Sequence, residues 1–151
     1  MPANISELIP VLQMSVSPVV VISGVGLLLL TLTNRLGRVI DRSRQLVSQL
    51  ADASEEEAAF LREEIAIIVR RAGFIQRSVF FALLCVLMAA LLVMTLFISA
   101  LFRLSSAWLV SALFIGSMIS LSVSLVEFIL DVNQSLQALY IELKHRGAGR
   151  P

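Results

Sequence analysis

Glu127 is an acidic residue in an unusual setting, because it lies inside an apolar run, residues 107–130, that is long enough to cross a bilayer. An ionised side chain costs on the order of 2.5–3.5 kcal/mol at the bilayer centre and less near the edge, so Glu127 needs a partner, a proton or water. Three interpretations follow. Glu127 forms a structural ion pair with Arg35 or Arg38, acts as a cation ligand or selectivity group in a pore, or packs in its protonated form.

Arginines are concentrated directly after the first apolar run, which ends at Thr33. With the interleaved amide and acid they form an exit segment consisting of Asn34, Arg35, Arg38, Asp41, Arg42 and Arg44. Such side chains can hold lipid phosphates at ~1 kcal/mol each near an anionic surface, or they can bind the acids of a partner protein, of Glu127 or of Asp131. They can equally anchor the topology, with long side chains that snorkel towards water.

Small and polar residues recur on one face of the third apolar run, stepping by four, four, three, four and three within an arc of about 80°. This polar stripe consists of Gly116, Ser120, Ser124, Glu127, Asp131 and Gln134. A similar face of the first run and its continuation holds Ser23, Leu27, Thr31, Asn34, Arg38, Asp41 and Gln45. The second run has little of this kind. We therefore expect spans one and three to face protein or water and span two to face mostly lipid.

Enzyme, metal and cofactor constellations are not found in the sequence. With one cysteine, Cys85, and one histidine, His145, neither an intrachain disulfide nor a multi-ligand Cys/His site can form. Gly24 and Gly26 lie inside an apolar run without the third glycine of a nucleotide loop. We expect a protein that is not an enzyme and holds no cofactor.

Composition places this chain among membrane proteins. Of its 151 residues, 58% are hydrophobic and 15% are charged, and the mean hydropathy is +0.90. Soluble domains are about 25% charged, so a soluble globule is excluded. A net charge of +1 offers no bulk field for nucleic acid. We predict an all-α fold with membrane spans over residues 18–34, 78–101 and 107–130, the first beginning with Ser17 as N-cap and Pro18 as first helical residue.

The basic residues predict an orientation. Residues 34–77 and the tail after Leu130 carry every Lys and Arg except Arg103, which follows the second span. By the positive-inside rule the N-terminus is outside, and residues 35–77 and 131–151 are in the cytoplasm. Residues 1–17 have no basic residue and a capping pattern at Asn4 and Glu7, which fits a short external amphipathic segment or, equally well, a frayed terminus.

The cytoplasmic part is predicted to be helical. Apolar positions step by four and three on three segments, as in a heptad seam, with Leu36, Ile40, Ser43, Val47 and Leu50 in the first and Leu61, Ile65, Ile68, Ala72 and Ile75 in the second. Ser54 and Glu57 form a capping box that starts the second helix after a break at residues 51–54. Residues 35–77 thus form a helical hairpin that sets Arg42 and Arg44 opposite Glu63 and Glu64, and residues 131–151 a third helix ended by Gly147 and Gly149.

The exit segment after TLTNRLGRVIDRSRQL, the Arg70-Arg71 return and a glutamate near the end of the last span resemble a family of small bacterial membrane proteins, domain of unknown function 2721. The resemblance extends from about residue 18 to residue 143. It implies a three-span protein of the bacterial inner membrane and brings no activity. Its motif is matched here by Asn34, Arg35, Arg38, Asp41, Arg42 and Glu127.

Two functions fit these observations. In the first, two polar faces on so thin a protomer favour a homo-oligomer, with an ion-conducting pore lined by spans one and three. In the second, the protein is an accessory or scaffold subunit. Its arginine-rich helices then dock on another membrane complex or on anionic lipid at the cytoplasmic face.

Overall fold

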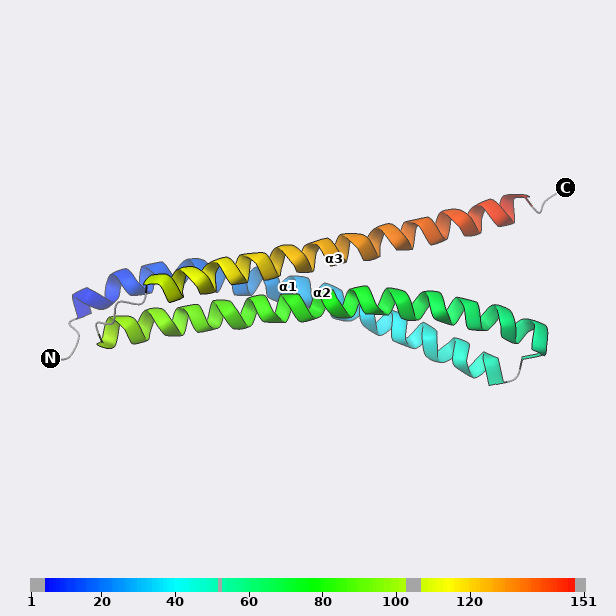
Figure 1. Ribbon diagram of the computed structural model, residues 1–151, viewed down its shortest axis with the longest axis horizontal. Coiled ribbons are helices and arrows are strands. Elements are labelled where there is room, and N and C mark those ends of the chain that lie inside the picture. Colours follow the sequence, from blue (N-terminus) through cyan, green and yellow to red (C-terminus); the bar gives the residue numbers. More distant parts are fainter. Residues whose placement is uncertain (1–4, 52, 103–106, 149–151) are drawn as a thin grey trace. The chain divides into compact units, whose positions relative to one another are not determined.

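Three long helices make up the protein. The computed structural model describes residues 5–51, 53–102 and 107–148, and the regular secondary structure in these ranges is α-helical. Helix α1 runs over Ile5–Ala51, α2 over Glu55–Phe102 and α3 over Ala107–Ala148 (Figure 1). Each contains a stretch long and apolar enough to cross a membrane. The predicted all-α fold with three spans is confirmed, while Asn4 and Arg103 lie outside the described residues.

Each helix is much longer than a membrane span requires. The helices have 47, 48 and 42 residues, which at ~1.5 Å per residue gives about 63–72 Å. The hydrocarbon core of a bilayer is only about 30 Å thick. Helix α3 therefore continues through the predicted boundary at residue 130, as expected, and ends next to Gly149.

The start of α1 differs from the prediction. Pro10 and Pro18 both lie inside one continuous helix that begins at Ile5, so Ser17 is not an N-cap. Proline is tolerated within apolar helices because neighbouring helices and hydroxyl side chains satisfy the backbone groups that it frees.

The connection between α1 and α2 follows the sequence closely. Glu57 Oε2 accepts hydrogen bonds from the backbone N–H of Ser54 at 3.2 Å and from its hydroxyl at 3.1 Å. The N–H of Ala58 donates to the Ser54 carbonyl at 2.8 Å. These contacts satisfy groups that the first turn of a helix leaves without partners, and the predicted capping residues do begin α2.

The chain divides into two compact units. The first comprises Met1–Thr31 and Val79–Ser124, and the second comprises Leu32–Ser78 and Leu125–Pro151. All three helices contribute to both. The first unit holds most of the apolar stretch of each helix, and the second holds the exit segment.

Small side chains on α2 and α3 fill the first unit. Helix α2 buries Ala82, Cys85, Ala89 and Leu92 at steps of three, four and three, and α3 buries Ser117, Ser120 and Ser124. A Cβ on Gly116 would lie 2.8 Å from the Met88 sulfur, so the two helices approach closely there. The other faces of α2 carry exposed large apolar side chains, among them Leu83, Leu87 and Leu91, and it stays a prediction that span two faces mostly lipid. Its alanines and cysteine allow close packing although they are not polar.

Many hydroxyl groups of the apolar helices are satisfied by their own backbone. Ser15, Ser23, Thr31, Thr95 and Ser122 each donate to the carbonyl four residues earlier, at 2.7–3.2 Å. Such a bond removes the cost of placing a hydroxyl in an apolar environment. Thr31 is exposed in this chain and still has its hydrogen bond.

In the second unit, α2 buries Ile75 of its predicted seam, whereas the buried residues of α1 differ from the predicted seam. Leu32 and Leu46 on α1 and Ile75 on α2 are buried, and Val39 lies midway between the first two in sequence. Ile40 and Val47, each one residue further on, are exposed. The buried line repeats every seven residues as expected, but one residue earlier. Val39–Ile40 and Leu46–Val47 are adjacent apolar pairs, so the sequence pattern fits either of two lines of residues. Packing against α2 buries the line that contains Leu46.

The burial of Ser124 generates a prediction. Replacing it with leucine forces extra methylene groups into a side-chain position with no exposed surface, so we expect Ser124→Leu to lower the free energy of unfolding by about 1–3 kcal/mol. Ser122→Leu is the matched control, because Ser122 is exposed on the same helix. Unfolding of both purified variants in detergent measures the difference. Equal stability of the two variants would contradict the packing described.

Candidate functional site

A buried carboxylate connects the three helices in the second unit. Asp131 on α3 has a fully buried side chain. Its Oδ2 lies 2.9 Å from Nη2 of Arg35 on α1, and its Oδ1 lies 3.9 Å from Nε of Arg71 on α2. Because an unpaired buried carboxylate is costly, these two arginines must accompany Asp131 when α3 packs.

The positions of Arg35 and Asp131 in the sequence account for their ion pair. Arg35 is the first basic residue after the apolar run of α1, and Asp131 lies one helical turn beyond Glu127 on the polar stripe. The Arg35 guanidinium also lies 5.2 Å from the ring centre of Phe128 on α3. A cation over an aromatic face is attracted by the ring, so Arg35 contacts α3 both by charge and by its flat surface.

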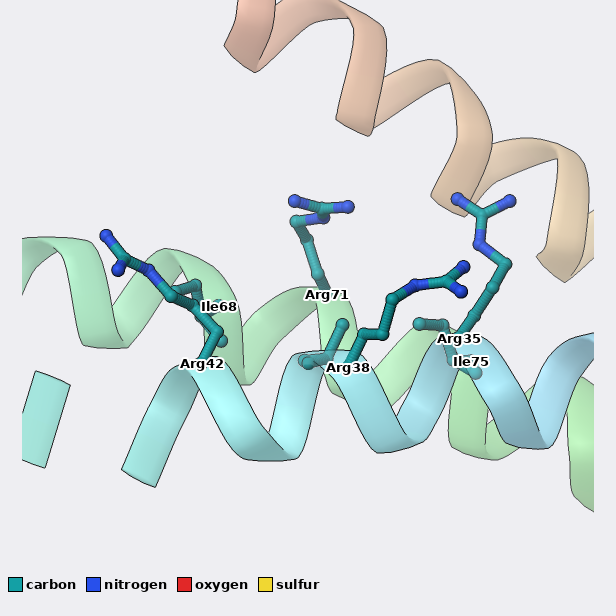
Figure 2. Close-up of a pocket in the computed structure, with 7 residues that line it drawn as sticks. Arg35, Arg38, Arg42, Ile68, Arg71 and Ile75 are labelled. Carbon is teal, nitrogen blue, oxygen red and sulfur yellow. The ribbon is translucent and has the colours of Figure 1, made fainter. Parts of the chain in front are cut away.

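Four arginines line one recess beside this ion pair. The recess has a volume of about 240 Å³ and is lined by Arg35, Arg38, Val39, Arg42, Ile68, Arg71 and Ile75. Figure 2 shows the guanidinium groups of Arg35, Arg38 and Arg71 gathered on one side of the α1 and α2 ribbons, towards the passing α3. The apolar side chains form part of its wall. Such a site is strongly positive and partly apolar.

A second ion pair lies further along the α1–α2 hairpin. Nη2 of Arg42 donates to Oε1 of Glu64 at 2.9 Å, with the two side chains 50% and 31% exposed. The predicted contact of Arg42 with Glu64 is confirmed. At this exposure the pair contributes about 0–1 kcal/mol, so it helps to set the register of the hairpin more than its stability.

Glu127 does not form the expected ion pair. Arg35 pairs with Asp131 instead, and Oε2 of Glu127 is buried without a hydrogen-bond partner among the described residues. The sequence places both acids on one stripe, one turn apart. Which of them meets Arg35 depends on the depth at which α3 packs, and the sequence does not specify that depth.

The remaining predicted site residues fall into separate groups. Asn34, Asp41 and Arg44 are exposed on α1 and do not line the recess. Gly116, Ser120 and Ser124 belong to the first unit, where they pack, and Thr31 is exposed there. Arg71 was not among the predicted site residues, although the Arg70-Arg71 pair on the return helix was its signal.

The chemistry available at the recess is the binding of an anion. Guanidinium groups are permanently charged and bind phosphate or carboxylate through paired N–H donors. Within the described residues, no group of three or more His, Cys, Asp or Glu side chains is placed to hold a metal ion. The recess can hold and orient a negatively charged group.

Comparison with known families gives one result. A family model described as "Protein of unknown function (DUF2721)" matches residues 15–141, and the resemblance noted in the sequence is thereby confirmed. Comparison with curated proteins and with solved structures finds no match.

The two ion pairs generate a matched prediction. Asp131→Asn removes a fully buried charge and leaves Arg35 without its partner, so we expect a loss of about 3 kcal/mol in the free energy of unfolding. Glu64→Gln makes the same chemical change in the exposed pair and should cost at most about 1 kcal/mol. Chemical unfolding of both variants in detergent micelles measures these values. A smaller loss for Asp131→Asn than for Glu64→Gln would refute the role given to Asp131.

Proposed function

The chain belongs to the DUF2721 family, whose description names no activity, and we propose that it is a non-enzymatic accessory or scaffold subunit of the bacterial inner membrane. Its N-terminus lies outside, and the second unit lies in the cytoplasm. The arginine-lined recess docks on an anionic surface there, either another membrane complex or anionic lipid. The observation that carries this proposal is the convergence of Arg35, Arg38, Arg42 and Arg71 on one recess.

The position of the recess along α1 supports this proposal, in addition to the charge of the recess. The recess begins at Arg35, directly after the apolar stretch of α1. Basic side chains at such a position lie near the level of the lipid head groups and interact with an anionic leaflet at ~1 kcal/mol each. The bound surface is therefore next to the membrane, not far into the cytoplasm.

The docking proposal predicts which molecules co-purify with the protein. We expect wild-type protein extracted in native lipid discs to carry a stoichiometric partner or an excess of anionic lipid. The double variant Arg38→Ala/Arg42→Ala should lose this companion. Arg62→Ala/Arg70→Ala is the control, since it removes the same charge from exposed arginines outside the recess. Lipid analysis and gel electrophoresis provide the measurement, and wild-type discs with bulk lipid composition and no partner would count against docking.

A second candidate function is a homo-oligomeric ion-conducting pore. The observation that favours it is the exposure of the polar face of α1, at Ser23, Leu27, Thr31, Asn34, Arg38, Asp41 and Gln45. Of these residues, Arg38 also lines the recess. A second copy or water can cover this face. Glu127 adds an acid to this proposal, because its Oε2 has no hydrogen-bond partner among the described residues and could serve a cation if the oligomer opens a path to it.

The pore proposal predicts a ring-like oligomer and a specific change in flux. Neutralising the acid with Glu127→Gln should alter cation flux into liposomes, because the variant keeps the size of the side chain and removes its charge. Glu64→Gln serves as the control on the hairpin. Impermeable liposomes that contain the folded oligomer would eliminate this function, and a monomer in native discs would do the same.

A further inference from the structure

The charges around the recess do not balance. Four arginines line it, and among the described residues Asp131 pairs with Arg35 and Arg71, and Glu64 pairs with Arg42. Arg38 makes no ion pair with any residue that the structure describes. These six side chains together carry a formal charge of +2. A bound group with two negative charges would neutralise it.

We propose that the recess is a binding site for a phosphate monoester, such as the head group of phosphatidic acid or a soluble phosphate. This inference rests on the proposed docking function and names its ligand. A phosphate monoester carries about −1.5 to −2 charge at pH 7 and three acceptor oxygens. The phosphodiester of an ordinary anionic phospholipid carries one negative charge and leaves half of the excess.

The geometry of the lining residues fits this ligand. The guanidinium groups of Arg35, Arg38 and Arg71 come from two helices and surround one space (Figure 2), so several paired N–H donors can reach one tetrahedral phosphate. The volume of about 240 Å³ suits a head group and is below the range for larger ligands. Val39, Ile68 and Ile75 offer apolar contact to the carbon atoms next to the phosphate.

Asp131 acts as an internal competitor of this ligand. Its carboxylate occupies the Nη2 side of Arg35 at 2.9 Å and lies 3.9 Å from Arg71 Nε. A bound phosphate would draw on the same guanidinium groups. The affinity of the site therefore depends on how strongly these arginines prefer a phosphate oxygen to the carboxylate of α3.

The test is competitive lipid retention by the full-length protein. Purified protein is mixed with equal amounts of phosphatidic acid, phosphatidylglycerol and phosphatidylcholine in detergent, and the retained lipids are counted by native mass spectrometry. We expect phosphatidic acid to be retained about fivefold over phosphatidylglycerol, because it brings one further charge to the arginines. Arg38→Gln should lower this retention about fivefold. Arg70→Gln, an exposed arginine outside the recess, should leave it unchanged.

A second arm separates the two sources of phosphate. Inorganic phosphate added during the competition displaces phosphatidic acid if the site accepts soluble phosphate, and displacement that disappears in Arg38→Gln assigns a soluble ligand. Retention that resists inorganic phosphate assigns the lipid. Equal retention of phosphatidic acid and phosphatidylglycerol would overturn the monoester site and leave anionic docking intact. No preference for either anionic lipid over phosphatidylcholine, together with no displacement by phosphate, would overturn both proposals.

Discussion

The need to pair a buried carboxylate sets the arrangement of the second unit. Asp131 has no exposed surface, and it has one arginine on α1 and another on α2 within ion-pair distance. Apolar contacts are non-directional and allow helices to slide, whereas a buried charge without its partner is strongly destabilising. The pair therefore fixes how α3 sits against the hairpin, and it draws Arg35 and Arg71 to the same side as Arg38.

Hydroxyl groups and carboxylates respond differently to an apolar environment. A serine or threonine can donate to its own helix, as Thr31 does to the carbonyl of Leu27, and can then face lipid at little cost. Asp131 is acceptor-only when ionised and cannot be satisfied by backbone carbonyls. A polar face on a membrane helix is thus a weak argument for self-association when it consists of hydroxyls. The charged and amide side chains of the α1 face are a stronger argument for self-association.

The arginine recess is a consequence of the same packing. Among the described residues, α3 supplies Asp131 to it and the hairpin supplies Glu64. A purely structural network would be expected to end near neutrality. The positive charge of the recess, directly after the apolar stretch of α1, is the chemical basis of the proposed docking on an anionic group.

The sequence by itself determined the three apolar helices and the start of α2, since apolar length and the serine–glutamate cap at Ser54 and Glu57 act locally. Pairing the hairpin about its turn also placed Arg42 and Arg44 opposite Glu63 and Glu64, and the structure selected the pair of Arg42 with Glu64. Tertiary structure decided the rest. On α1 it buried Leu32 and Leu46 and left Ile40 and Val47 exposed. It also buried the small residues of α2. It paired Arg35 with Asp131 and not with Glu127. These choices depend on the rotation and depth at which whole helices meet, and residues one position or one turn apart satisfy the same sequence pattern.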